Sequence, residues 1–365
     1  MDLSFLKPLY RRPGPVASVY ADLSRTTEDA AKAAELRWRA LRSELEEQDC
    51  PEDTLRAIDG TVTGELAERR SEGLVLFAAG GEIVHAGRLP DPPAVTQARV
   101  GPLPHVLPWL TARGERFPYM VVVVDRKGGA IECVTAEGER ERIDVPGDED
   151  YPIRKVKAGD WNQSRFQRSA EETWKANAKK VGREVDRAAR RVHAEVIMIA
   201  GDVRARNAVL EEISEGVREY TVESDRHEIG DPELQSELSR VLDLKCAERV
   251  FAVAERFERE LARGERAVAG LPATVEAARN GQIEALLLDD ADSPARLWVG
   301  PEPDQIATDP EELRRYGVDD PREERADAAL IRAVACTDGG LVIVPPRDSD
   351  AGLGFGAVLR FTATP

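Results

Sequence analysis

A single basic stretch, residues 153–193, constrains the fold of this chain more than any other feature. Apolar residues recur in it at intervals of three, four or seven, which is the spacing of one face of a long helix. These residues are Phe166, Ala170, Trp174, Val181, Val185, Ala188 and Val192. The pattern predicts a helix that packs this face on neighbouring strands, with Trp174 in the core.

Charge also separates this stretch from the rest of the chain. It holds twelve Lys and Arg and five Asp and Glu residues, a net charge of 12 − 5 = +7. The whole chain carries −17, so the remainder sums to −17 − 7 = −24. Charged helix faces are usually only solvated, but this excess of one sign extends into the preceding loop and favours contact with phosphates. The acidic remainder disfavours DNA as a partner.

Length and composition bound the class of protein. A chain of 365 residues is too long for one ordinary core and predicts two to three domains. Its four cysteines are scattered without a CxxC pair, and its four histidines are scattered too, so we expect no metal, cofactor or disulfide framework. The first residues lack the apolar core of a signal peptide, and no run is long enough to span a membrane. We therefore expect a cytoplasmic protein with no membrane partner.

The order of elements predicts an α/β fold in three domains, 1–112, 113–228 and 229–365. The first domain is predicted to hold a strand at Val16–Leu23, two helices, and a hairpin that turns at Gly80 and Gly81. Residues 89–108 are rich in proline and are predicted to be a strand-poor linker.

The second domain is predicted to begin with two strands joined by a turn at Gly128 and Gly129, of which residues 121–124 are buried on both faces. A polar, turn-rich segment at 138–152 leads to the basic loop and the long helix. The third domain is predicted to begin with a long amphipathic helix and to contain loops across much of 289–325. The apolar face of that helix comprises Leu234, Leu238, Val241, Leu242, Leu244, Val250, Val253 and Phe257.

Three residues at the predicted start of the long basic helix can contact RNA: Trp161, Asn162 and Gln163. Backbone N–H groups at a helix start attract anions, and an indole and two amides can stack on unpaired bases and hydrogen-bond to them. In the alternative interpretation this segment is a capped turn, and Trp161 folds onto its own domain. The residues alone leave both interpretations open.

Other motifs are weak. The run Gly352–Gly356 resembles half of a phosphate loop, but a strand follows it and no Lys-Ser/Thr pair does, so it is predicted to be a turn. No GxSxG motif is present, and no histidine forms a visible triad with a serine. An RNA-processing nuclease would need clustered carboxylates, for which Asp125 and Asp202, each at a strand end, are the candidates.

Residues 159–168, GDWNQSRFQR, resemble the segment GGQSAxRFxR of the class-1 peptide release factors of eukaryotes and archaea. Gly159, Arg165, Phe166 and Arg168 match without a gap, and a long charged helix and the strand VIMIAGD follow. Residues 119–138 resemble the middle domain of these factors. The third domain resembles their C-terminal domain through ATVEAARNGQIEALLLDD and GLGFGAVLRF.

The sequence is more similar to the bacterial release-factor/Pelota-like proteins, especially their actinobacterial branch, and to the related Balon-type ribosome hibernation factors. It departs from the catalytic GGQ tripeptide, because Asp160 replaces the second glycine, Trp161 replaces the glutamine, and Gln163 comes two residues later. The resemblance implies a translation factor that binds the ribosome in the A site and peptidyl-transferase region, in hibernation or rescue. Ribosomal RNA, tRNA and elongation factor Tu are its candidate partners.

The predicted RNA-binding residues are Arg154, Lys155, Lys157, Trp161, Asn162, Gln163, Arg165, Arg168, Lys175 and Lys179. No catalytic residue is assigned with them. The alternative function is peptidyl-tRNA ester hydrolysis, in which Gln163 would orient the attacking water by position alone.

Overall fold

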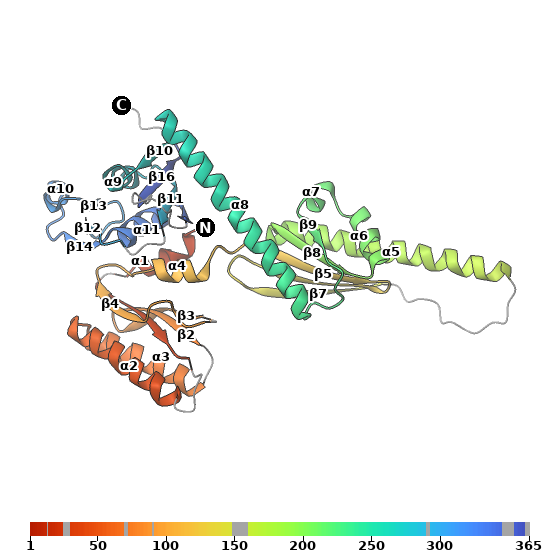
Figure 1. The fold of residues 1–365 in the computed structure, drawn as a ribbon, viewed down its shortest axis with the longest axis horizontal. Helices are drawn as coiled ribbons and strands as arrows, with labels where there is room; N and C mark the ends of the chain where they lie inside the picture. Colours follow the sequence, from red (N-terminus) through yellow and green to blue (C-terminus); the bar gives the residue numbers. More distant parts are fainter. Residues whose placement is uncertain are drawn as a thin grey trace. The chain divides into compact units, whose positions relative to one another are not determined.

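The computed structural model describes residues 1–12, 14–24, 30–68, 72–89, 91–147, 160–289, 293–344 and 354–361, with the backbone alone at 30–31 and 160–171. The chain forms two compact units, drawn in Figure 1. Unit 1 combines Met1–Gly114 with Val250–Pro365, and unit 2 is Glu115–Arg249. Both consist of helices layered on β-sheets, so the predicted α/β class is confirmed.

The first half of unit 1 is a four-stranded antiparallel sheet of order β3-β2-β1-β4. Its strands are β1 (Val16–Asp22), β2 (Gly73–Ala79), β3 (Glu82–Leu89) and β4 (Gln97–Gly101). The helical segments are η1 (Ser4–Leu6), α1 (Lys7–Tyr10), α2 (Ala30–Glu47), α3 (Glu52–Glu68) and α4 (Leu107–Arg113). Ala17 and Val19 of β1 pack with α2 and α3, whereas Tyr20 belongs to the cluster on the other face, so β1 is buried on both sides.

The prediction of a strand-poor linker at residues 89–108 is wrong. Gln97–Gly101 forms β4, which pairs antiparallel with β1. Prolines flank this strand, and none lies within it, so its backbone N–H groups remain available for the ladder. An edge strand of five residues bounded by prolines has too short an apolar pattern to be recognised by periodicity.

The second half of unit 1 contains two smaller sheets, of order β10-β16-β11-β15 and β13-β12-β14. The strands are β10 (Ala267–Ala269), β11 (Ile283–Asp289), β12 (Arg296–Val299), β13 (Ile306–Ala307), β14 (Arg322–Arg325), β15 (Gly340–Val344) and β16 (Phe355–Leu359). The helices are α9 (Leu271–Arg279), α10 (Pro310–Arg315), α11 (Ala326–Cys336) and the last part of α8 (Pro232–Arg263). The prediction that much of 289–325 consists of loops is therefore incomplete. Besides β12, this range contains β13, α10 and β14.

The two halves of unit 1 share one hydrophobic cluster, to which Leu6 and Phe77 contribute from the first half and Ile283 and Leu330 from the second. The division of the chain at 112 and 229 into three domains stays a prediction, and contacts group the two outer segments into one unit.

Buried charges also join the two halves of unit 1. Glu324 of β14 is 1% exposed, forms an ion pair with Arg99 of β4, and accepts a hydrogen bond from the backbone N–H of Leu103 at 3.1 Å. Asp327 lies beside this pair. Burial would raise the pKa of Asp327, but the side chains of His105 and Arg325 next to its carboxylate lower that pKa to about 2. Asp327 is therefore ionised at neutral pH.

Unit 2 is built on a five-stranded sheet of order β7-β6-β5-β8-β9, in which β5, β8 and β9 are parallel. The strands are β5 (Tyr119–Asp125), β6 (Gly128–Val134), β7 (Arg140–Pro146), β8 (Val196–Gly201) and β9 (Thr221–Glu223). Its helices are α5 (Asp160–Val192), α6 (Val203–Glu212), α7 (Glu215–Arg218) and the first part of α8. The clusters on the two sheet faces include Val122 and Val121 respectively, so the predicted two-sided burial of β5 is confirmed.

Two details of unit 2 differ from the sequence prediction. The β5–β6 turn lies at Arg126 and Lys127, and Gly128 already pairs with Asp125. A Cβ on Gly128 would lie 2.2 Å from the Val145 carbonyl oxygen, so this glycine permits the close approach of β7. The segment 138–152 is not simply a turn-rich loop, because residues 140–146 form the edge strand β7.

The long helix α8 is confirmed, but its predicted apolar face is wrong at Leu244, which is 62% exposed. Leu234, Leu238 and Phe257 are buried as expected. No helix in the described ranges is both long enough and apolar enough to cross a membrane.

Candidate nucleic-acid interface

The helix α5 carries the predicted amphipathic pattern over its described side chains. Ala178, Val181, Val185 and Ala188 are buried against the sheet of unit 2. Gly182 faces α6, and a Cβ there would lie 2.9 Å from the Cβ of Glu212, so the two helices pack closely. This apolar stripe fixes which face of α5 is left for solvent or a partner.

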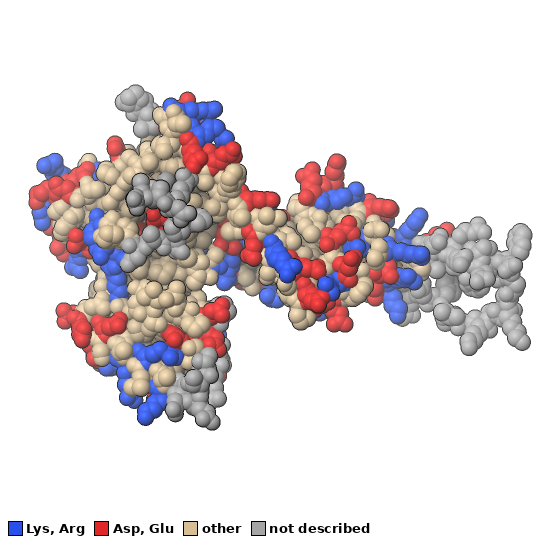
Figure 2. All heavy atoms as spheres, in the orientation of Figure 1, with Lys and Arg blue, Asp and Glu red and all other residues tan. Residues whose placement is uncertain are grey.

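The opposite face of α5 is basic. Lys175, Lys179, Arg183 and Arg190 are exposed and recur at intervals of four and seven, which places them on one side of the helix. None of these four forms an ion pair in the described part of the chain. Figure 2 shows Lys and Arg side chains gathered over the described part of α5. These cations are therefore available to an anionic partner.

Not every cation of α5 is available. The guanidinium of Arg187 lies 3.1 Å from the Glu184 carboxylate, and that of Arg191 lies 2.7 Å from the carboxylate of Glu141 in β7. Hydrogen bonds to Glu141 are the main cause of a raised pKa of Arg191. Tertiary structure thus distinguishes Arg187 and Arg191, which are paired, from Arg190, which forms no ion pair with any residue that the structure describes.

Trp174 lies at the edge of the core, which corrects the prediction that it is a core residue. It is only partly buried, and the guanidinium carbon of Arg126 lies 4.7 Å from its ring centroid. Its indole Nε1 is buried and has no hydrogen-bond partner in the described part of the structure. A cavity of about 160 Å³ adjoins Trp174 and Arg126 and is also lined by Lys175 and Arg204. Sequence reasoning did not select Arg126 or Arg204, because each belongs to a different element.

The predicted RNA-binding residues fall into three groups. Lys175 and Lys179 are exposed on the basic face. The backbone of residues 160–168 forms the first turns of α5, so Trp161, Asn162 and Gln163 stand at its start, but the side chains of residues 161–168, including Arg165 and Arg168, lie outside the described part. The basic loop before α5, residues 153–159, lies entirely outside the described residues. It contains three of the predicted RNA-binding residues, Arg154, Lys155 and Lys157.

The candidate nuclease carboxylates, Asp125 and Asp202, stabilise a turn and a helix start respectively. Asp125 Oδ1 accepts a hydrogen bond from the backbone N–H of Lys127 at 2.7 Å in the β5–β6 turn. Asp202 caps α6 by accepting hydrogen bonds from the N–H groups of Arg204 and Ala205. The hydrogen bond from Ala205 is the main reason that the pKa of Asp202 is lowered. In the described ranges, no three His, Cys, Asp or Glu side chains converge as a metal site would require.

Comparison with known proteins identifies the segment that carries this interface. Residues 118–263 match the model of bacterial archaeo-eukaryotic release factor family 2. Over this segment the chain is similar to the bacterial members of the release-factor family. The match includes α5 and the whole sheet of unit 2. The predicted relationship to bacterial release-factor/Pelota-like proteins is confirmed.

Two uncharacterized proteins of Mycobacterium tuberculosis, from strains CDC 1551 and H37Rv, resemble this chain along almost its full length. Each is 28% identical over 373 aligned positions, which cover 98% of this chain and 96% of the relative.

Solved structures that this chain resembles include the archaeal translation termination factor aRF1. The identity is 17%, the TM-score is 0.28, and the match covers 98% of this chain and 96% of the other. Pelota of Archaeoglobus fulgidus has 15% identity and a TM-score of 0.32, over 100% and 93%. A ribosome-bound model of archaeal Pelota and ABCE1 contains a chain with 16% identity and a TM-score of 0.39, over 99% and 95%. These TM-scores are too low to support an argument about function, so the similarity to bacterial release factors rests on residues 118–263.

Proposed function

We propose that this protein is a ribosome-binding translation factor that contacts ribosomal RNA through the basic face of α5. One observation carries the proposal: within a release-factor segment, α5 presents four exposed cations without ion pairs among the described residues. RNA phosphates are the polyanion that a release-factor relative would meet, and lysine and arginine contacts to phosphates supply affinity without needing a base sequence.

The proposal extends to the start of α5 and the basic loop before it. Arg154, Lys155, Lys157, Arg165 and Arg168 would hold phosphates of ribosomal RNA or tRNA in the A site, near the peptidyl-transferase region. Trp161 occupies the position of the catalytic glutamine, so the protein would occupy this site without hydrolysing peptidyl-tRNA. Its role would be ribosome hibernation or rescue in the cytoplasm, with elongation factor Tu as a neighbour.

Reversing three charges on α5 tests the proposal. A variant with Lys175→Glu, Lys179→Glu and Arg183→Glu removes three candidate phosphate contacts while keeping the buried stripe. We expect weaker co-sedimentation with ribosomes, and a dependence of log K on log salt that is shallower by about three units. The measurement is ribosome pelleting over a series of salt concentrations, with circular dichroism to verify the fold.

A matched control carries the same charge change on unit 1, with Lys32→Glu, Arg56→Glu and Arg315→Glu, all at exposed positions. Full binding by this control together with loss in the α5 variant supports a local contact. Equal losses in both variants would show a general field effect, and unchanged pelleting of the α5 variant would remove the proposal.

Hydrolysis of peptidyl-tRNA is the second candidate function, favoured by the position of Gln163 in the first turn of α5 within a release-factor segment. We expect ribosomes carrying a labelled peptidyl-tRNA to retain the peptide when the protein is added. The measurement is peptide release by the original protein and by Gln163→Ala. Release that depends on Gln163 would replace the non-catalytic proposal with a hydrolase, while leaving ribosome binding intact.

A further inference from the structure

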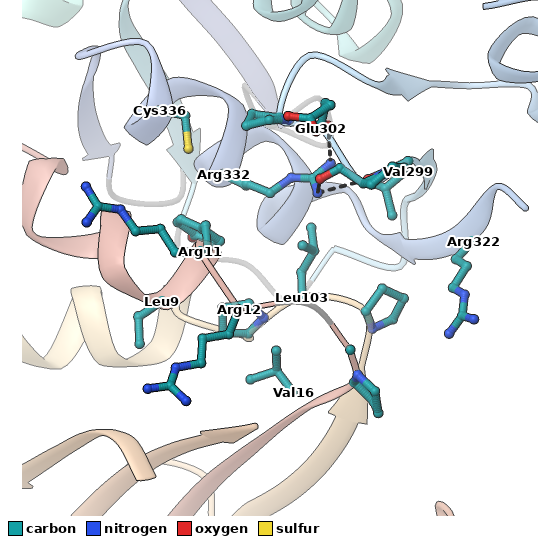
Figure 3. A pocket seen from close by; sticks show the side chains of 18 of the residues that line it. Leu9, Arg11, Arg12, Val16, Leu103, Val299, Glu302, Arg322, Arg332 and Cys336 are labelled. Carbon is teal, nitrogen blue, oxygen red and sulfur yellow. Dashed lines mark hydrogen bonds between the residues drawn. The ribbon is translucent and has the colours of Figure 1, made fainter. Parts of the chain in front are cut away.

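Unit 1 contains a cavity of about 740 Å³ that is separate from the basic face of α5 (Figure 3). Tyr10 and Leu103 line it from the first half of the unit, and Val299 and Arg332 line it from the second. Small-molecule sites in proteins are usually about 300–1,000 Å³ in volume. The cavity therefore has room for a ligand of moderate size.

Arg332 brings a positive charge into this cavity without a counter-ion among the described residues. Its side chain on α11 is 5% exposed, and its two Nη atoms donate to the backbone carbonyls of Gly300 and Glu302, each at 3.0 Å. Its Nε is buried with no hydrogen-bond partner among those residues, and no carboxylate there forms an ion pair with it. Burial lowers the pKa of Arg332, but a guanidinium keeps its proton. A buried cation that has no counter-ion is costly even when backbone carbonyls accept its hydrogen bonds, and a bound anion would offset that cost.

Tyr10 supplies a second unsatisfied group. Its hydroxyl oxygen is buried and has no hydrogen-bond partner within the described structure. Burial raises the pKa of Tyr10 far above its usual value, so the hydroxyl stays protonated and can donate to an anion. Burial also raises the pKa of the Cys336 thiol, which lines the same cavity and therefore adds no negative charge at neutral pH.

Basic side chains outnumber acidic ones around the cavity, five to two. Three of the basic residues are held in ion pairs. These pairs are Lys7–Asp338, Arg12–Glu82 and Arg322–Asp320. Arg11 is exposed and forms no ion pair in the described part of the chain, so Arg11 and Arg332 are the two cations left for a ligand.

The remaining wall is apolar and stiff. Leu9, Val16, Leu103 and Val299 line it together with prolines from the loops that follow β4 and β12. Proline has a fixed backbone φ, so these loops offer a stiff and preformed surface. A ligand that fits both parts of the cavity has an anionic group at one end and an organic body at the other.

We propose that this cavity binds a small organic phosphate of nucleotide size. The phosphate would lie against Arg332 Nε and Tyr10 Oη, and the organic body would lie against Leu103 and Val299. The exposed Arg11 side chain points away from Arg332 in this structure (Figure 3) and would turn toward the phosphate on binding. A doubly charged phosphate suits two cations and a hydroxyl donor better than a single carboxylate does. A ligand in this position contacts both halves of unit 1, so it should stabilise the unit by binding only its folded form.

Calorimetric titration of the full chain tests this proposal with inorganic pyrophosphate, AMP, ADP and adenosine. We expect AMP and ADP to bind, pyrophosphate to bind more weakly, and adenosine not to bind. Tyr10→Phe and Arg11→Gln should each weaken ADP binding by about 10-fold, which corresponds to the loss of one hydrogen bond to a charged group. ADP should also raise the melting temperature of the original protein more than that of either variant.

Tyr10→Phe and Arg11→Gln are chosen because neither change removes a contact that holds the fold. Arg332 also holds the carbonyls of the loop at 300–302, so its replacement would disturb the fold, whereas Tyr10→Phe removes a hydroxyl that has no partner among the described residues. Arg56→Gln on the exposed surface of α3 is the matched control and should leave ADP binding unchanged. If pyrophosphate, AMP and ADP all fail to bind at millimolar concentrations, or if ADP binds Tyr10→Phe and Arg11→Gln as well as the original protein, the proposal is wrong.

Discussion

Replacement of Gly201 by alanine is expected to destabilise unit 2 by about 4 kcal/mol or more. Gly201 ends β8 with a backbone φ of +112°, which residues other than glycine rarely adopt. A Cβ there would lie 1.9 Å from the carbonyl oxygen of Val124 in β5. Its backbone N–H also donates to the carbonyl of Arg226 at 2.6 Å. The clash falls on two adjacent central strands, so the sheet cannot relax without losing register.

Amide hydrogen exchange of the full chain measures this effect in unit 2 alone. Peptides from β5 and β8 should exchange much faster in Gly201→Ala, whereas peptides from β1 and β2 in unit 1 should keep their protection. Gly216→Ala is the matched control, because Gly216 lies in the short helix α7 and a Cβ added there would have no atom within 4 Å. It should be neutral or slightly stabilising. Equal exchange in the two variants would refute the steric argument.

Replacement of Glu324 by alanine is expected to destabilise unit 1 by about 3 kcal/mol. The variant would leave Arg99 without its carboxylate and would remove the acceptor for the Leu103 and Arg325 backbone N–H groups. Leaving such groups unpaired costs more than the net contribution of the original bonds. Since Arg99 and Leu103 belong to the first half of unit 1 and Glu324 to the second, both halves should become less stable.

Thermal unfolding and hydrogen exchange of peptides from β4 and β14 measure this change. Glu323→Ala is the matched control, because Glu323 is the neighbouring residue on β14 and is exposed. Its effect should stay within about 0.5 kcal/mol. The double variant Arg99→Ala with Glu324→Ala leaves no unpaired cation. Its loss of unfolding free energy should therefore be smaller than the sum of the losses in the two single variants. Strict additivity would show that the ion pair does not couple the two halves.

Long elements with a strong pattern were predictable from the sequence. The apolar stripe through Val181 and Val185 predicted α5, and the run from Val121 to Val124 predicted a strand buried on both faces. Such patterns repeat over several turns or a whole strand, so local information is enough. The short edge strands β4 and β7 were missed, because each has few apolar residues and is defined by pairing with a distant strand.

The candidate site was predictable only in part. Its basic character and its place on α5 follow from the sequence, and Lys175 and Lys179 are exposed as an interface requires. The sequence could not distinguish Arg190 from Arg191, although they are neighbours. Glu141 of β7 pairs with Arg191 and leaves Arg190 unpaired among the described residues, and this contact depends on a strand that was not predicted.

The order of residues alone therefore determined the α/β class, the amphipathic α5, the concentration of positive charge and the likeness to release factors. Tertiary structure alone decided which of the described cations are neutralised and which remain unpaired. It also decided that Tyr10 and Arg332, from opposite ends of the chain, line one cavity. The physical reason is range: helical and strand periodicity acts between close neighbours in sequence, whereas ion pairing and burial depend on groups brought together by the folded chain.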